Sequence, residues 1–293
     1  MSFYGSPLTI NAGGIDMLSA VDDAGIYVPL VLGATQSWDI ASGRTLVVDA
    51  PVSGAGGLNI ISRGTVVLEG TNTCSGPLTI SNGTLQVSGL ISNAVTMAGG
   101  AFSANGTVTG PVVVNSGTLN GTGTLTGPVV INAKGTLAPG PGLGTLTISN
   151  TLTLQPGSQT TIAVNKSTGS SAQIIGLAGI TYGGTLVVNN QAGVLAAGDS
   201  FNIFGAANYS GAFNRISPAT PGNGLAWDLS DLAADGILRV TLQLADDRAF
   251  GRTATGPLVA DAQSRLVSAI ADQYPGDRFG TQLGDGTRLD RDQ

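Results

Sequence analysis

The sequence predicts an all-β protein built as a solenoid, in which short strands stack coil upon coil. A strand–turn–strand unit recurs at nearly constant spacing, and its turn glycines Gly83, Gly100, Gly117 and Gly135 are 17, 17 and 18 residues apart. A fixed period of this size is typical of repeats that stack on their neighbours. Within each unit apolar and polar residues alternate, as in Leu78-Thr79-Ile80, which indicates strands with one buried face.

The composition agrees with a solenoid of this kind. Glycine accounts for 45 of the 293 residues, but the hydrophobic content of 42% and the alternating runs favour a folded chain over disorder. Charged residues make up only 10%, against about 25% in an average protein. The surface must therefore be covered by Thr, Ser, Asn, Gln and Gly, which suits stacked parallel strands because like charges placed above one another repel.

The clearest repeat, residues 70–89, reads GTNTCSGPLTISNGTLQVSG. It resembles the passenger-associated repeat of bacterial autotransporters, except that Cys74 stands where that family usually has an aromatic residue and Pro77 where it usually has Gly or Thr. The phrases LGATQSWDIASGRTLVV and GGTLVVNN extend the resemblance over roughly residues 8–244. The resemblance implies a right-handed parallel β-helix displayed outside a bacterial cell or on its outer surface, and it implies very little about a ligand.

Four segments follow from this pattern. Residues 1–39 are expected to form the first coils, without an evident capping helix, and residues 40–165 the regular β-helix repeats. Residues 166–245 are expected to form less regular final coils, whose large aromatic side chains close one end of the core. Residues 246–293 are predicted to be a tail with a short amphipathic helix over Leu258–Gln273, followed by a disordered segment.

Charge and residue usage exclude several classes of partner and cofactor. The net charge of −6 and the absence of a basic patch argue against nucleic-acid binding. The chain has no His and a single cysteine, Cys74, so an internal disulfide is excluded and the commonest metal ligand is missing. No apolar run reaches the ~18 residues of a membrane helix, and the N-terminus lacks the basic and apolar regions of an export signal.

The regular coils are poor in catalytic groups. A polysaccharide hydrolase or lyase needs clustered carboxylates or basic residues, yet residues 58–165 contain only Arg63, Glu69 and Lys134. We therefore predict no enzymatic activity, no cofactor and no metal site. A denser group of charged residues between positions 199 and 239 is the one candidate ligand region, although solvated, turn-capping aspartates are the simpler interpretation: Asp199, Asp228, Asp231 and Arg239.

Three further patterns are interpreted as structural. Cys74, at a turn, is expected to be a small buried or half-buried residue. Asparagines near the turn glycines are expected to stack as an internal amide ladder: Asn82, Asn115 and Asn132. Thr-x-Thr pairs such as Thr107/Thr109 would suit an ice-binding face. Because the pairs do not share one offset from the turn glycines, we interpret them as ordinary strand residues.

Three hypotheses about function follow. The leading one is a non-enzymatic extracellular structural or adhesive module, with a glycan or a host-matrix component as its ligand. The second is a filament subunit that associates end to end through unpaired strand edges at the open ends of the solenoid. The third is a carbohydrate-active β-helix enzyme whose site lies in the 199–239 region.

Overall fold

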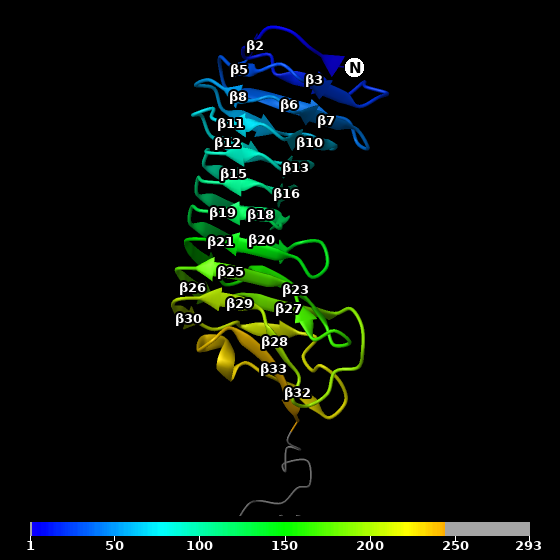
Figure 1. The fold of residues 1–293 in the computed structure, drawn as a ribbon, viewed down its shortest axis with the longest axis vertical. Coiled ribbons are helices and arrows are strands. Elements are labelled where there is room, and N and C mark those ends of the chain that lie inside the picture. The colour runs from blue at the N-terminus through cyan, green and yellow to red at the C-terminus, as the bar shows by residue number, and fades with distance from the viewer. Residues whose placement is uncertain (1, 244–293) are drawn as a thin grey trace, which may run out of the picture. The chain divides into compact units, whose positions relative to one another are not determined.

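The computed structural model describes residues 2–243, and they form a straight stack of β coils, each coil being one full turn of the chain (Figure 1). Almost all neighbouring strands pair in parallel. The parallel β-helix predicted from the sequence is therefore confirmed. The predicted helix and tail over residues 246–293 lie outside the described residues.

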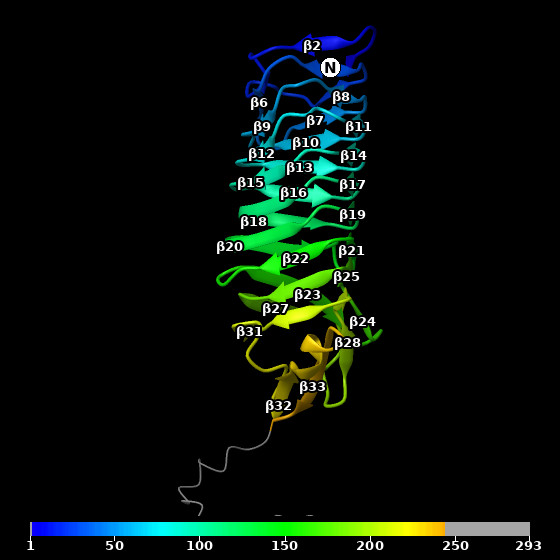
Figure 2. The same cartoon turned by 90° about the vertical axis from the view of Figure 1, so that its left-hand side faces the viewer.

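The coils build three faces, which run along the length of the stack (Figure 2). Face I consists of β3 (Ile15–Met17), β6 (Gln36–Ile40), β9 (Leu58–Ile60), β12 (Leu78–Ile80), β15 (Val95–Met97), the first parts of β18 (Val112–Gly121) and β20 (Val129–Pro139), β22 (Thr151–Leu154), β26 (Gly179–Tyr182) and β30 (Tyr209–Gly211). Face II consists of β1 (Ser2–Phe3), β4 (Ala24–Ile26), β7 (Thr45–Val48), β10 (Thr65–Leu68), β13 (Thr84–Val87), β16 (Ala101–Ala104), the second parts of β18 and β20, β23 (Gln159–Asn165), β27 (Thr185–Asn190) and β31 (Arg215–Ser217).

Face III completes each coil with the shortest strands. It consists of β2 (Leu8–Ile10), β5 (Leu30–Leu32), β8 (Val52–Ser53), β11 (Thr71–Asn72), β14 (Leu90–Ile91), β17 (Thr107–Val108), β19 (Thr124–Leu125), β21 (Thr145–Ile148), β25 (Gln173–Leu177) and β29 (Phe204–Ala206). A hydrogen bond from Thr73 N–H to the Val52 carbonyl (2.8 Å) joins its first three strands to the rest. The two-residue antiparallel strand β24 (Ser170–Ser171) belongs to a hairpin with the end of β23.

The register of the strands confirms the predicted period. On face I, Ile80, Met97, Val114 and Ile131 lie above one another at steps of 17 residues. The single step of 18 arises from a bulge after Val114, beyond which Ser116 pairs with Lys134. The coils are larger towards both ends, with steps of 23 residues from Ile15 to Trp38 and 29 from Ile180 to Tyr209. The smallest coils therefore lie in the middle of the stack.

The alternate residues of each strand meet inside the coils. The inward positions predicted from the sequence are at most 1% exposed: Leu78, Ile80, Val112, Val114, Val129 and Ile131. They belong to one apolar core that runs from Ile26 to Val240. Burying one such side chain contributes about 1.5–3 kcal/mol, so stacking of the coils stabilises a core that no single coil could form.

The C-terminal end of the stack is closed by a different structure. Strands β28 (Ser200–Asn202), β33 (Ile237–Leu242) and β32 (Leu225–Asp228) form an antiparallel sheet, and the 3₁₀ helix η1 (Ser230–Ala233) precedes β33. The prediction that all of residues 166–245 form further coils is therefore wrong for residues 200–202, 225–228 and 237–242. Alternating apolar residues indicate a strand but not the direction of its partner, so the pattern could not reveal the change from parallel to antiparallel pairing.

The predicted aromatic closure of this end is present. Tyr182 packs against Phe204 and Phe213, with ring centroids 5.2 and 5.0 Å away. The hydroxyl group of Tyr182 donates a hydrogen bond to the Leu232 carbonyl of η1 (2.9 Å). Leu232 and Leu238 are 3% and 0% exposed, so the antiparallel sheet and η1 cover the last coils; we call these two elements the C-terminal cap.

The N-terminal coil has no comparable cover among the described residues. Its inward residues Ile10, Ile15 and Met17 are only half-buried, and Leu8 is 42% exposed. Within residues 2–243 no helix is long and apolar enough to cross a membrane.

Candidate functional site

The candidate ligand region of the sequence lies on and beside the C-terminal cap. Asp228 of β32 and Ser200 of β28 both lie opposite Arg239 of β33. Asp231 comes from η1, and its carboxylate accepts a hydrogen bond from the Nε of Arg239 in an ion pair. The structure therefore brings three of the four predicted residues together: Asp228, Asp231 and Arg239.

Asp199 is engaged elsewhere. Its carboxylate forms an ion pair with the Nζ of Lys166 and accepts a hydrogen bond from the Ala196 N–H (2.8 Å). The side chain of Asp199 is 10% exposed. Burial is the largest single influence on the pKa of Asp199, and burial alone would raise that pKa. The hydrogen bonds from Lys166 and Ala196, with the charge of Lys166, together outweigh burial and lower the pKa of Asp199.

The charges around Arg239 stabilise one another. Asp228 accepts hydrogen bonds from the hydroxyl (2.7 Å) and the N–H (3.0 Å) of Ser230, and these bonds lower the pKa of Asp228. The pKa of Arg239 is raised by its hydrogen bond to Asp231 and by the negative charges of Asp231, Asp235 and Asp228. A glycosidase needs one carboxyl group with a raised pKa to act as the general acid. The pKa of Asp228 is shifted in the opposite direction.

Metal ligation gains no support from the described part of the chain. No group of three or more acidic or cysteine side chains there lies close enough together to hold a metal ion.

The cysteine is buried and unreactive. Cys74 is 3% exposed, and burial raises the pKa of its thiol, although the amide of Asn93 lies 3.4 Å from its Sγ. A thiol becomes a nucleophile when its pKa is lowered, so Cys74 is suited to packing and not to chemistry. The expectation of a small buried residue at this turn is confirmed.

The internal amides come from positions that the sequence analysis missed. Asn82 and Asn115 are exposed and Asn132 is half-buried, and the Nδ2 of Asn132 donates to the Oδ1 of Asn115 (2.7 Å) on the outside of the coils. The predicted internal ladder is therefore wrong. The buried asparagines are Asn72 and Asn93 instead, 1% and 5% exposed.

These two buried amides bridge neighbouring coils. The amide of Asn72 accepts from the Val52 N–H (3.1 Å) and donates to the carbonyls of Gly70 (2.9 Å) and Leu90 (3.1 Å). The side chains of a strand alternate between its two faces, so the outward residues Thr71 and Thr73 place Asn72 between them on the buried face. The sequence therefore contained a signal for Asn72, but proximity to a turn glycine selected Asn82, Asn115 and Asn132 instead.

Face III carries a regular grid of hydroxyl groups. One column consists of outward residues at paired positions in successive coils, and Leu90 interrupts its hydroxyl groups: Thr71, Leu90, Thr107, Thr124 and Thr147. The second column lies two residues further along each strand: Thr73, Ser92, Thr109, Thr126 and Ser149. All members of the second column are exposed, whereas all members of the first column except Thr71 are half-buried.

The grid contains two of the Thr-x-Thr pairs, Thr107/Thr109 and Thr124/Thr126. Thr71, Leu90, Thr107 and Thr124 each lie seven residues after a glycine of the preceding turn, at positions 64, 83, 100 and 117. Thr147 lies 12 residues after Gly135, because the chain from Pro139 to Thr147 is five residues longer than the chain between their partners Gly121 and Thr124. Two of the Thr-x-Thr pairs therefore share one offset, Thr107/Thr109 and Thr124/Thr126, whereas Thr145/Thr147 does not and Thr151/Thr153 lies on face I.

The band of coils that bears this grid has no charge. Between Glu69 and Lys134 the sequence contains no Asp, Glu, Lys or Arg. Searches of the sequence against known protein families and against curated proteins find no match. The resemblance to autotransporter passenger repeats therefore stays a prediction.

Proposed function

We propose that this chain is a non-enzymatic structural and adhesive module, which acts outside a bacterial cell as a stiff rod that presents long neutral faces to a ligand. The observation that carries the proposal is the uncharged band of residues 70–133 with its hydroxyl grid on face III. The extracellular location depends on the resemblance to passenger repeats alone.

The spacing of the grid favours an extended, repetitive ligand. Neighbouring coils are about 4.8 Å apart, and alternate residues of one strand are about 6.6 Å apart. Each hydroxyl both donates and accepts hydrogen bonds, but one such bond contributes only about 0.5–1.5 kcal/mol. Useful affinity therefore requires many contacts made together, which a long chain of sugar units provides.

Charge and rigidity narrow the class of ligand. A surface without ionic groups offers no counter-charge to an acidic polymer, so a neutral glycan fits it better than an acidic one. The backbone of each column is fixed by interstrand hydrogen bonds on both sides, so little conformational entropy is lost on binding.

The test is binding to a panel of neutral and acidic polysaccharides, measured with immobilised glycans. The variant Thr109→Lys/Thr126→Lys places two large cations in adjacent coils of the grid, and we expect it to weaken binding at least about tenfold. The matched control Thr79→Lys/Thr96→Lys makes the same change in two stacked outward threonines of face I and should bind normally. A wild-type protein that binds no neutral glycan, or an equal loss in both variants, would contradict the proposal.

The ice-binding alternative uses the same grid, and measuring thermal hysteresis with the same two variants separates it from glycan binding. The carbohydrate-active alternative has weaker support, because Asp199 does not join the group around Arg239 and the pKa values of Asp199 and Asp228 are lowered.

A further inference from the structure

Three tripeptides of identical sequence occupy different places in the coils. Asn-Gly-Thr occurs at residues 82–84, 105–107 and 120–122. Asparagine is a chemically labile residue, and a following glycine favours loss of its side-chain amide because glycine has no Cβ to keep the backbone nitrogen away from that amide. Since the three copies share their sequence, any difference between them in reactivity comes from the structure.

The loss of the amide needs only water. The backbone nitrogen of the glycine gives its proton to solvent and attacks Cγ of the asparagine, a C–N bond forms, and the Cγ–Nδ2 bond breaks, so that ammonia leaves. Water then opens the resulting succinimide ring at either carbonyl, which produces an aspartate or an isoaspartate with one new negative charge. The glycine N–H must be free, because a hydrogen bond that it donates retains its proton and holds the nitrogen away from Cγ.

Two of the three copies are held by neighbouring coils. The Gly106 N–H donates to the Val87 carbonyl of the preceding coil (2.8 Å), and the Oδ1 of Asn105 accepts from the Thr122 N–H of the next coil (3.2 Å). Residues 120–121 lie inside β18, which pairs with β16 on one side and with β20 on the other. In both copies the attack on Cγ would first have to break contacts between coils.

The first copy is free to react. Asn82 and Gly83 lie in the turn between β12 and β13, and Asn82 is exposed. Within residues 2–243, neither the Gly83 N–H nor the side-chain amide of Asn82 has a hydrogen-bond partner, although the Gly83 carbonyl accepts from the Ala101 N–H (2.8 Å). The attacking nitrogen and the amide that it attacks are therefore both accessible to water in the folded protein.

The geometry of the turn requires the glycine of this pair. The φ angle of Gly83 is 69°, and a Cβ at this position would lie 2.5 Å from the carbonyl oxygen of Ser62. The equivalent turns at Gly64, Gly100 and Gly117 also have glycine, but the residues before them are Arg, Gly and Ser. Among these four turns, the fold therefore combines a required glycine with a preceding asparagine only at position 82.

A cationic residue occupies the neighbouring position of the stack. Thr65 pairs in register with Thr84, so Arg63 holds the place of Asn82 in the preceding coil, about 4.8 Å away along the stack. A guanidinium group at this place favours the negative charge that develops on the attacking nitrogen and on the oxygen of the tetrahedral intermediate. It also favours the carboxylate product, because opposite charges on adjacent strands attract.

We propose that Asn82 converts spontaneously to aspartate or isoaspartate in the folded protein, while Asn105 and Asn120 are protected by their coils. The product adds a negative charge to the band of residues 70–133, which the sequence leaves without charge. Since the reaction runs in one direction, the fraction of charged chains grows with the age of the protein. The site lies at the corner between faces I and II, away from the hydroxyl grid of face III.

The test is to incubate the full chain at mildly alkaline pH and to follow the loss of each amide by peptide mapping with tandem mass spectrometry. We expect the carboxylate product at position 82 first, and products at positions 105 and 120 at least about tenfold more slowly, because those copies must first break hydrogen bonds between coils. In urea that unfolds the chain, the three copies should react at similar rates, since only the structure distinguishes them.

Two variants complete the test, and circular dichroism verifies that each is folded. Arg63→Gln removes the neighbouring cation and should slow the reaction of Asn82 several-fold, while Asn223, in a separate exposed turn before β32, reacts as in the wild type. Asn82→Ser removes the site and should leave the rates at positions 105 and 120 unchanged.

Two results would overturn the proposal: an Asn82 that keeps its amide in the folded chain while the unfolded chain loses it, or equal rates at Asn82 and Asn105 in the folded chain. A wild-type rate in Arg63→Gln would overturn the part assigned to the cation. Glycan binding does not enter these measurements, so the outcome is independent of the proposed function.

Discussion

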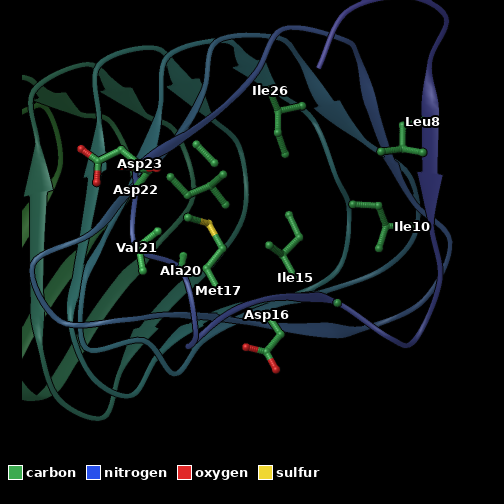
Figure 3. A pocket seen from close by; sticks show the side chains of 13 residues that line it. Leu8, Ile10, Ile15, Asp16, Met17, Ala20, Val21, Asp22, Asp23 and Ile26 are labelled. Atoms are coloured by element: carbon green, nitrogen blue, oxygen red, sulfur yellow. The ribbon is translucent and has the colours of Figure 1, made fainter. Parts of the chain in front are cut away.

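The two ends of the described stack solve the same problem in different ways. Every solenoid leaves an apolar cross-section at each end, and the last coil has no neighbour to bury it. At the C-terminal end the chain changes to antiparallel pairing and places Leu232 and Leu238 over the last coils, where the hydroxyl group of Tyr182 of β26 donates a hydrogen bond to the Leu232 carbonyl. At the N-terminal end Leu8 and Val21 face solvent, and both line a cavity (Figure 3). In this stack closure comes with a change of strand direction, whereas a further parallel coil would only move the exposed surface outward.

The same substitution at both ends tests whether the cap buries its apolar residues. Leu238→Ala removes a side chain that is 0% exposed beneath the cap, and Leu8→Ala removes one that is 42% exposed at the N-terminal end of the stack. We expect losses in the free energy of unfolding of about 2–5 kcal/mol for Leu238→Ala and below about 1 kcal/mol for Leu8→Ala. Urea denaturation at low protein concentration measures both, and equal losses would mean that the cap does not bury its leucine.

Two glycines, one at each end, test how closely the backbone of the cap is packed against the last coil. Gly236 at the cap and Gly43 near the N-terminal end have similar φ angles of 76° and 73°. A Cβ at Gly236 would meet the Phe204 carbonyl, whereas a Cβ at Gly43 would meet nothing within 4 Å.

Both substitutions by alanine carry the cost of the left-handed conformation, about 1 kcal/mol. Gly236→Ala must in addition displace the cap from the last coil, so its loss should reach about 3 kcal/mol. Thermal unfolding of the two variants gives the difference. If Gly43→Ala is as damaging as Gly236→Ala, backbone conformation alone accounts for both losses.

The middle of the stack could be predicted from the sequence because its coils are nearly identical. A constant step of 17 residues and period-2 alternation determine which residues face inward, and Leu78, Ile80 and Val112 are buried as expected. The ends could not be predicted in the same way. The strands of the cap show the alternation of ordinary coil strands, and alternation does not reveal whether a partner runs parallel or antiparallel.

The candidate sites show the same limit. Asn82 and Asn72 both occur in the clearest repeat, but a shift of one residue moves a side chain from the outside of a strand to the core. The five extra residues between Pro139 and Thr147 similarly move Thr147 and Ser149 out of the period of the turn glycines, although both stay in the columns of the grid. A shift of one residue therefore determines which side chains lie on the surface and which in the core, even where the repeat pattern predicts the fold correctly.

The smallest expected effect concerns the ion pair beside the cap. The pKa of Asp199 is lowered in the folded protein, so the unfolded chain binds a proton more readily and stability rises with pH in this range. The stabilisation by Asp199 is present above its unfolded pKa of about 4 and is lost as the pH falls through the lower folded value.

The difference in unfolding free energy between the wild type and Asp199→Asn should therefore shrink as the pH is lowered from about 6 to about 2.5. Urea midpoints measured across this range test it. Lys166→Met removes the cation of the pair, and the double variant measures the coupling between the two side chains. Because Lys166 is 35% exposed, we expect a coupling below about 1 kcal/mol. A difference that stays constant with pH would mean that Asp199 stabilises this region as a hydrogen-bond acceptor without regard to its charge.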